Sequence, residues 1–536
     1  MQKFRFLFLS LAIVVFLILA FKKPYGSSSL IGNFDPFPDS LHYVVPARNF
    51  VAGAGFILGR ADGELKIQVP PLYSWSLIPV YFFNNDVRGF YFANVILGIL
   101  SIFLLYKISY KLSKSVWVTG LLLFLYVTSF VIYWQPSLAM AENILLLMCF
   151  LALWFSLQPL SNKNIILASI FAVACYGSKY VSLPVTAVSV LFILWRVYRE
   201  KKETKKIQRI LLVLFSAFLS FLVFNGSQFF IYIGKFFQKS LASNPQLELE
   251  TAWLSLKYFG QSFPKYFQAL MGLPIYNLWY VKPILPVGLA ALVIIWSLYA
   301  VWQLPKKRDL ALLILGLIAG QLAFLSVILM IEGRYAFIFI PIVFTGAAAM
   351  FGWLVESCQQ KFGEKKIEVM QTIGVVLIAG AFSLMNFKDL KTQLLVNFKG
   401  GETPWWQVGV MAGDQFMAKQ IEAENSPKII ISSLSPFVWD FYRQNDYLVL
   451  PFSATQSMIK DPIWGIGFDQ NNLFSFYQEQ LKLGKKIYLD TVGFGRADWP
   501  ILEAYKAAGF DLQLKQEDCM GACKIYEVTN AGHYAL

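Results

Sequence analysis

YAFIFIPIVFTGAAAMFGWLV, at residues 335–355, is an apolar run of 21 residues that contains no acidic or basic side chain. About 20 apolar residues are enough for an α-helix to cross the hydrocarbon core of a bilayer. Similar runs recur along the 536-residue chain, which is 57% hydrophobic and only 15% charged and has a mean hydropathy of +0.55. Soluble domains do not have this composition. The sequence therefore predicts a polytopic α-helical membrane protein.

Eleven membrane spans are predicted from these runs. The first, at residues 6–21, has no clear small-x-small cleavage site after it, so we interpret it as an uncleaved signal anchor. A shorter apolar segment at 72–82, which contains Pro79, is interpreted as re-entrant or interfacial. The other ten spans are expected at residues 88–107, 115–134, 143–158, 164–180, 182–198, 209–230, 284–303, 310–331, 335–355 and 368–387.

Basic residues decide the orientation of these spans. With eleven spans, the dense basic loops at 107–114, 196–209, 306–308 and 361–366 all fall on one side, which the positive-inside rule identifies as the cytoplasm. We therefore expect a protein of the cell (plasma or inner) membrane, with a cytoplasmic N-terminus and an outer side that carries two long loops, 22–85 and 231–283. Because the net charge of +14 is concentrated in short loops, it does not indicate nucleic-acid binding; the bilayer is the expected partner.

The composition changes at about residue 400, where polar residues return. Strands are predicted at 428–433, 447–450 and 486–490, helices at 473–483 and 500–508, and a terminal hairpin at 511–514 and 524–528. This alternation predicts a small α/β domain with a mostly parallel sheet. The chain is thus divided into a transmembrane domain, 1–390, and an extracytoplasmic α/β domain, 400–536. Cys519 and Cys523 bracket Met-Gly-Ala in this second domain, and a local disulfide and two free thiols both stay open.

A few charged residues lie at the outer ends of the apolar runs, whereas most others avoid these runs. Because a charge in or beside a bilayer costs free energy, its position is informative. Charges of both signs on one face suit an anionic substrate that approaches from the lipid. The residues are Asp39, Glu142, Lys179, Glu332 and Arg334.

Several short motifs follow one another along the first 350 residues. They are Asp39 with Tyr43 and Ala47, Gly53 and Gly55, Pro70-Pro71-Leu72 with Trp75, Ala141-Glu142-Asn143, Gly177-Ser178-Lys179, and Gly333-Arg334-Tyr335 with Pro341. In this order they resemble the GT-C glycosyltransferases, with the greatest similarity to the branch of protein O-mannosyltransferases and the lipid A aminoarabinose transferase. The resemblance covers roughly residues 1–350. It implies a GT-C-like fold, a sugar donor on a polyprenyl phosphate, and transfer with inversion at the anomeric carbon.

The resemblance also implies a role for each charged residue. Asp39 is expected to be the catalytic general base, which takes the proton from an acceptor hydroxyl. Lys179 and Arg334 are expected to neutralise the lipid phosphate as it leaves, and Glu142 to orient hydroxyl groups of the sugar or acceptor. The remaining substrate-binding candidates are Tyr43, Tyr335 and Asp35.

Two positions depart from the family pattern. Ser40 follows Asp39, where many relatives carry Asp-Glu, so a second carboxylate is missing and we predict no metal or other cofactor. Val69 replaces the Lys that precedes Pro-Pro in aminoarabinose transferases, so their donor and their lipid A acceptor are not carried over. The sugar, the acceptor (lipid, glycan or protein) and the length of the prenyl carrier stay open.

Most candidates also have a structural interpretation. In it the side chain caps a helix, forms a turn, reaches the membrane interface or pairs with a neighbouring side chain, and does not bind a substrate. These alternatives are a helix N-cap for Asp39 and Glu142, a turn for Asp35, extension to the interface for Lys179, an ion pair with Glu332 for Arg334, and an interface anchor for Tyr43.

The function predicted from these features is that of an inverting glycosyltransferase acting at the outer face of the membrane. The alternatives are a transporter or flippase, or a polymerase or ligase, of lipid-linked glycans. A transporter is expected to have polar or broken helices near the midplane and repeat-related halves. Because the charges gather at one end of the spans instead, the glycosyltransferase is favoured.

Overall fold

The protein is mostly helical, with one small sheet near its C-terminus. The computed structural model describes residues 2–21, 39–53, 55–56, 69–83, 89–200, 203–240, 259–274, 283–327, 333–399, 426–432, 448–451, 470–490, 499–518 and 523–530. The first helical elements are α1 (Gln2–Ala20), α2 (Asp39–Val51), α3 (Leu72–Phe83), α4 (Phe90–Ser113), α5 (Val116–Val127), α6 (Phe130–Trp134), η3 (Gln135–Ser137), α7 (Glu142–Ser156), α8 (Asn162–Ser178), η4 (Tyr180–Ser182) and α9 (Leu183–Tyr198). They are followed by α10 (Glu203–Ser240), α12 (Leu289–Gln303), α13 (Arg308–Val327), η5 (Gly333–Ile338), α14 (Phe339–Phe362) and α15 (Glu364–Lys399).

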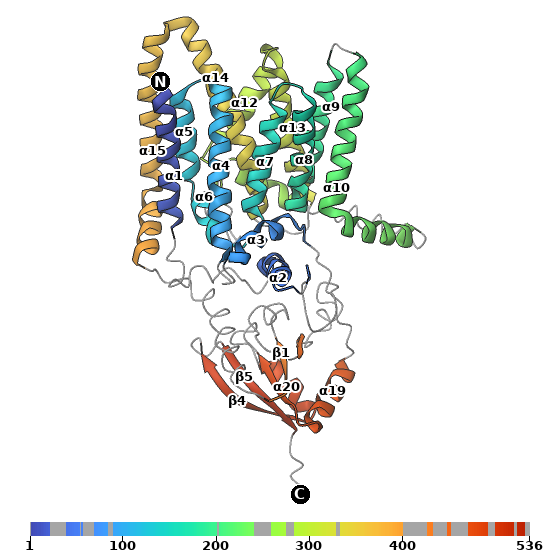
Figure 1. The fold of residues 1–536 in the computed structure, drawn as a ribbon. Helices are drawn as coiled ribbons and strands as arrows, with labels where there is room; N and C mark the ends of the chain where they lie inside the picture. Colours follow the sequence, from blue (N-terminus) through green and yellow to red (C-terminus); the bar gives the residue numbers. More distant parts are fainter. Residues whose placement is uncertain are drawn as a thin grey trace.

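The long helices stand side by side as a bundle with two distinct ends (Figure 1). The N-terminus and the α14–α15 connection lie at one end, and α2 and α3 lie at the other. The four basic loops predicted to share one side follow α4, α9, α12 and α14, and all lie at the N-terminal end, which we call the basic end. The C-terminal sheet lies beyond the opposite end, which we call the α2–α3 end. Which end faces the cytoplasm stays a prediction.

The predicted spans coincide with helices, but their lengths vary. Among the described residues, six helices are long and apolar enough to cross a membrane, or seven if a bent pair counts as one span. The two members of that pair are α5 and the segment Phe130–Ser137, which comprises α6 and η3, and the angle between them is 59°. The sequence predicts a single helix at 115–134. At the bend, the hydroxyls of Thr128 and Ser129 donate to the carbonyls of Phe124 and Leu125, both at 2.6 Å, and such back-bonding bends helices. Four predicted spans fall on shorter helices, α1, α7, α8 and α12, so eleven crossings stays a prediction.

Helix α14 forms the centre of the bundle, because most of its first half is buried. It contacts α4, α5, α7, α12 and α13. At Gly352 its backbone lies so close to α4 that an added Cβ would stand 2.6 Å from the Leu112 carbonyl oxygen. Only glycine permits this approach. By contrast, α10 extends to Ser240, about three turns beyond its predicted end at residue 230.

The C-terminal sheet is mixed, not mostly parallel as predicted. Its strand order is β2-β1-β3-β5-β4, from β1 (Lys428–Ser432), β2 (Leu448–Pro451), β3 (Lys486–Asp490), β4 (Phe510–Asp518) and β5 (Cys523–Asn530). The pairs β1–β2 and β1–β3 are parallel, whereas the terminal hairpin adds the antiparallel pairs β3–β5 and β4–β5. The helices α19 (Gln470–Lys482) and α20 (Trp499–Ala507) bury Tyr477 and Tyr505 against one face, with Ile429 and Ile431. Cys519 lies outside the described residues, so its pairing with Cys523 stays a prediction.

Candidate functional site

A buried ion pair joins two neighbouring helices at the α2–α3 end. Glu142 is the first residue of α7, and Lys179 follows the last residue of α8, in an extended conformation that separates α8 from η4. The Lys179 ammonium donates to Glu142 Oε1, and the side chains are only 11% and 1% exposed, respectively. Lys179 therefore does not extend to the interface. An ion pair this deeply buried is costly unless its remaining polar atoms are satisfied.

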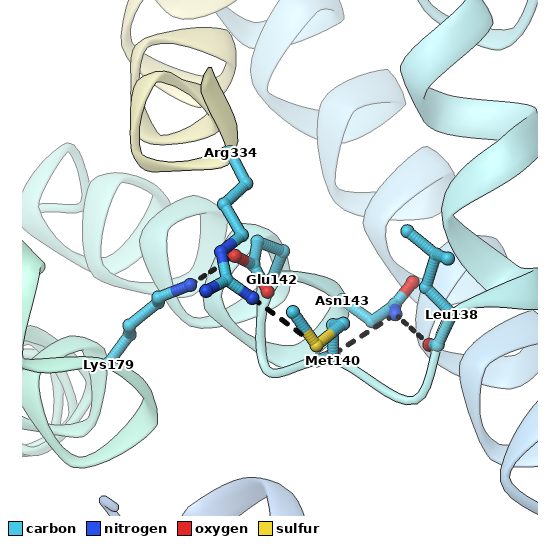
Figure 2. A network of polar contacts seen from close by, with 6 residues as sticks. All are labelled: Leu138, Met140, Glu142, Asn143, Lys179 and Arg334. Atoms are coloured by element: carbon cyan, nitrogen blue, oxygen red, sulfur yellow. Dashed lines mark hydrogen bonds and ion pairs between the residues drawn. The ribbon is translucent and has the colours of Figure 1, made fainter. Parts of the chain in front are cut away.

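Arg334 and Tyr335 complete the same cluster from a third element, η5. The Lys179 ammonium lies 4.9 Å from the centre of the Tyr335 ring, and the Arg334 guanidinium lies 5.8 Å from it. Arg334 also donates to the sulfur of Met140 at 3.6 Å. Figure 2 shows Arg334 and Lys179 approaching Glu142 from different helices. Two cations thus share one aromatic ring, with a single carboxylate between them among the described residues. Glu332, the alternative partner of Arg334, lies outside these residues.

One carboxylate oxygen of this cluster has no hydrogen-bond partner among the described residues. Glu142 Oε2 is buried and makes no hydrogen bond within the described part of the chain. Buried polar atoms are almost always hydrogen-bonded, and an exception calls for an explanation such as a bound molecule. The cluster therefore combines two cations with an unsatisfied hydrogen-bond acceptor. That combination suits a ligand that carries both an anionic group and hydroxyl groups.

Two buried asparagines hold the turn that leads into Glu142. The amide of Asn94, from α4, donates to the carbonyls of Pro136 and Leu138 at 3.2 and 2.7 Å. The amide of Asn143 donates to the carbonyl of Gln135 at 3.3 Å. It also donates to those of Leu138 and Met140, at 3.4 and 3.2 Å (Figure 2). Because η3 and the residues after it are not regular helix, these side chains add hydrogen bonds to the few that the backbone of the turn makes itself.

The asparagine network extends to the first motif through α3. The Tyr73 hydroxyl donates to Asn94 Oδ1 at 2.8 Å, and its ring meets that of Tyr43 edge to face, with centroids 5.3 Å apart. Both tyrosines are buried, and the substrate-binding role of Tyr43 stays a prediction. Asp39 is the first residue of α2, the helix that carries Tyr43. Its side chain and the whole of Asp35 lie outside the described residues, so their roles stay predictions.

Replacing Asn94 with leucine is expected to destabilise this turn. It removes two hydrogen bonds to buried carbonyls and the Asn94 acceptor of the Tyr73 hydroxyl, and a buried group left without its partner costs about 1–3 kcal/mol. Thermal unfolding of the purified protein in detergent measures the loss. Ser169→Ala is the control, because this buried hydroxyl bonds only to Ile165 in its own helix. Equal unfolding temperatures for the two variants would contradict the positioning role of Asn94.

The structure brings together four of the predicted site residues, Glu142, Lys179, Arg334 and Tyr335. No role was predicted for Asn94, Tyr73 or Asn143. A signal was present for Asn94, because an asparagine within the apolar run 88–107 is unfavourable in lipid unless it is hydrogen-bonded. No group of three His, Cys, Asp or Glu side chains among the described residues could hold a metal ion. Asp35 and the side chain of Asp39 lie outside these residues, so metal dependence stays open.

Comparisons with known proteins rest on structure, because no protein-family model and no curated protein matches the sequence. The chain is similar to a crystal structure of ArnT from Cupriavidus metallidurans bound to undecaprenyl phosphate, with a TM-score of 0.57, 14% identity and coverage of 97% of each chain. Two structures of an Archaeoglobus fulgidus oligosaccharyltransferase, one apo and one with an inhibitory peptide and a dolichol-phosphate, have TM-scores of 0.49 and 0.48 at 13% identity. They match 99% of this chain and 75% and 74% of theirs. The similarity to ArnT extends over the helical bundle and the C-terminal sheet.

Proposed function

We infer from the GT-C fold of this chain that it is a membrane glycosyltransferase, and we propose that it transfers a sugar from a polyprenyl-phosphate donor to an acceptor hydroxyl. The observation that carries the proposal is the buried cluster of Lys179, Arg334 and Tyr335 around Glu142. It stands at the α2–α3 end, where a lipid phosphate can meet two cations while its prenyl chain stays in the bilayer. The ArnT structure of the same fold contains undecaprenyl phosphate, which supports a lipid-phosphate ligand here.

The proposed reaction is a single displacement at the anomeric carbon. The acceptor oxygen forms a bond to this carbon as the bond between the carbon and the phosphate oxygen breaks, so the configuration is inverted. Asp39 takes the acceptor proton as general base, for which it must lie within hydrogen-bond reach of the hydroxyl. The electron pair of the broken bond leaves with the polyprenyl phosphate.

Lys179 and Arg334 are proposed to stabilise the negative charge that develops on the departing phosphate. Such preorganised charge is usually the largest catalytic contribution when it acts away from water. Arginine suits paired contacts with phosphate oxygens, and lysine acts as a point charge. Glu142 holds Lys179 in place through Oε1, and its unpartnered Oε2 can accept a hydrogen bond from a hydroxyl of the sugar or the acceptor.

The outer face of the cell membrane is the proposed location of the reaction. The cluster lies at the end of the bundle opposite the basic loops, and basic loops are retained in the cytoplasm. The same orientation puts the C-terminal sheet outside. We also propose that no metal ion takes part, because Ser40 stands where relatives carry a second acid. Transfer in the presence of EDTA is expected to be unchanged.

Removal of the gene tests the proposed function. The deletion strain is expected to lose one sugar from a surface glycan, lipid or protein, as seen by glycan analysis, and the wild-type gene is expected to restore it. Loss of a flippase would remove the same sugar, but the lipid-linked precursor would then accumulate at the inner face of the membrane. Accumulation there would favour a flippase instead.

Arg334→Ala is expected to lower kcat/KM for the lipid donor by about 10²–10³-fold, the usual effect of removing one transition-state contact. Arg199→Ala is the matched control, because it removes an arginine at the opposite, basic end of the bundle. There the Arg199 guanidinium lies 2.7 Å from the Asp309 carboxylate. The measurement is sugar transfer in membranes over a range of donor concentrations. Equal donor dependence for the two variants would mean that Arg334 has a structural role only.

A further inference from the structure

A second cluster of cations lies at the basic end, around the last turn of α7. Lys107 and Lys111 are one turn apart on α4, and their ammonium groups lie 5.8 and 5.3 Å from the centre of the Trp154 ring. Lys111 also donates to Gln158 Oε1 at 2.7 Å. From α9, Arg196 donates to the carbonyls of Ser156 and, at 3.0 Å, Gln158. Three positive side chains from two helices thus meet at one turn.

No carboxylate among the described residues pairs with these cations, whereas three other cations of this end are paired. Arg199 pairs with Asp309, Arg209 with Glu200, and Lys307 with Glu356. Lys111 is instead repelled by Lys114 and Arg196, and the one carboxylate that attracts Arg196 is Asp309, which is already paired. The partial negative charge at a helix C-terminus is only about half an elementary charge. The turn therefore keeps an uncompensated positive charge.

An exposed apolar stripe of α4 leads along the membrane to this cluster. Its residues are spaced by three or four, so they lie on one face of the helix and continue to Lys107. The Lys107 ammonium lies 4.9 Å from the ring of the last of them, Phe103. The stripe consists of Phe92, Ile96, Leu100 and Phe103, which are 39–54% exposed.

We propose that Lys107, Lys111 and Trp154 form a binding site for the phosphate of an anionic phospholipid, whose acyl chains follow the stripe on α4. The chemistry of the lipid matches that of the site. The two lysines have no carboxylate partner among the described residues, and tryptophan is enriched at the level of the headgroups. The stripe on α4 offers apolar surface for the acyl chains. Basic pockets between membrane helices on the cytoplasmic side are suited to such headgroups. This site is separate from the Glu142 cluster, at the other end of α7, and does not depend on the proposed function.

Native mass spectrometry of the purified full-length chain, titrated with dioleoyl-phosphatidylglycerol or dioleoyl-phosphatidylcholine, tests the proposal. The wild type is expected to bind the anionic lipid more tightly. The double variant Lys107→Gln/Lys111→Gln is expected to bind it about thirtyfold more weakly, because each basic residue near an anionic surface contributes about a fivefold factor. Its affinity for phosphatidylcholine is expected to be unchanged.

Two further variants distinguish a specific lipid site from non-specific attraction by the positive charge of the basic end. Lys205→Gln/Lys206→Gln also removes two positive charges at the basic end, and it is expected to bind phosphatidylglycerol as the wild type does. Lys107→Arg/Lys111→Arg keeps the charge and is expected to retain binding, which guards against misfolding of the glutamine variant. Equal loss in both glutamine variants, or no preference of the wild type for the anionic lipid, would overturn the proposal. Displacement of the lipid by inorganic phosphate at equal concentration would mean that the cations recognise free phosphate rather than a lipid.

Discussion

Replacing Asp39 with asparagine is expected to reduce sugar transfer by about 10²–10⁴-fold, the usual contribution of a positioned general base. Asparagine has nearly the same shape as aspartate but cannot accept the acceptor proton. The residue begins α2, whose Tyr43 packs against Tyr73 of α3, and Tyr73 in turn bonds to Asn94. The measurement is transfer of radiolabelled sugar in membranes that contain equal amounts of the two proteins.

Two controls make the Asp39 result interpretable. Asp35→Asn separates the two interpretations of that residue: activity is retained if it is a turn residue and falls if it is an auxiliary acid. Thermal unfolding in detergent is expected to be the same for Asp39→Asn and the wild type, because asparagine also begins helices well. Normal sugar transfer by a correctly folded Asp39→Asn protein would remove Asp39 from the mechanism.

Breaking the Glu142–Lys179 pair is expected to have the largest effect on stability. Replacing either residue alone with methionine leaves the other charge buried and unpaired, which costs about 3–5 kcal/mol. The double variant Glu142→Met/Lys179→Met removes both charges of the pair, so part of the lost unfolding free energy is expected to return, although Arg334 then lacks the carboxylate of the cluster. Exposed pairs contribute only about 0–1 kcal/mol, so Arg199→Ala, which breaks the Arg199–Asp309 pair, is the matched control.

The same double variant separates structure from chemistry. If Lys179 binds the lipid phosphate, the stable double variant still fails to transfer sugar and binds undecaprenyl phosphate more weakly than the wild type. If the pair only holds α7 to α8, the double variant recovers activity together with its unfolding temperature. Single variants as stable as the wild type would show that the pair is not buried as described.

The membrane helices could be predicted because each satisfies its own backbone within one apolar run. The strand β3 was predicted with its observed bounds, 486–490, because its short apolar run lies between turn residues. Failures occurred where the outcome depends on another segment. The sheet is mixed because the hairpin of β4 and β5 adds to the edge of β3, and no local pattern specifies that edge.

The site could be predicted only in part, for a related reason. Sequence order placed Glu142, Lys179 and Arg334 at the same ends of their spans, since successive helices reverse direction. It did not specify that Lys179 pairs with Glu142, because the contact joins residues 37 positions apart. The bend between α5 and α6 occurs at two adjacent hydroxyl residues, Thr128 and Ser129. Their presence in the run 115–134 did not by itself indicate that they donate to carbonyls of their own helix.

The shortness of α7 has a consequence for both of its ends. Fifteen residues of α-helix measure about 22 Å, less than the roughly 30 Å of hydrocarbon in a bilayer. With Trp154 at the level of the headgroups, Glu142 at the other end of α7 lies within the hydrocarbon depth. Screening requires mobile counterions in the surrounding water, so high salt is expected to leave the buried Glu142–Lys179 cluster largely unaffected. Lys107 is exposed, so binding of an anionic lipid there is expected to weaken in molar sodium chloride.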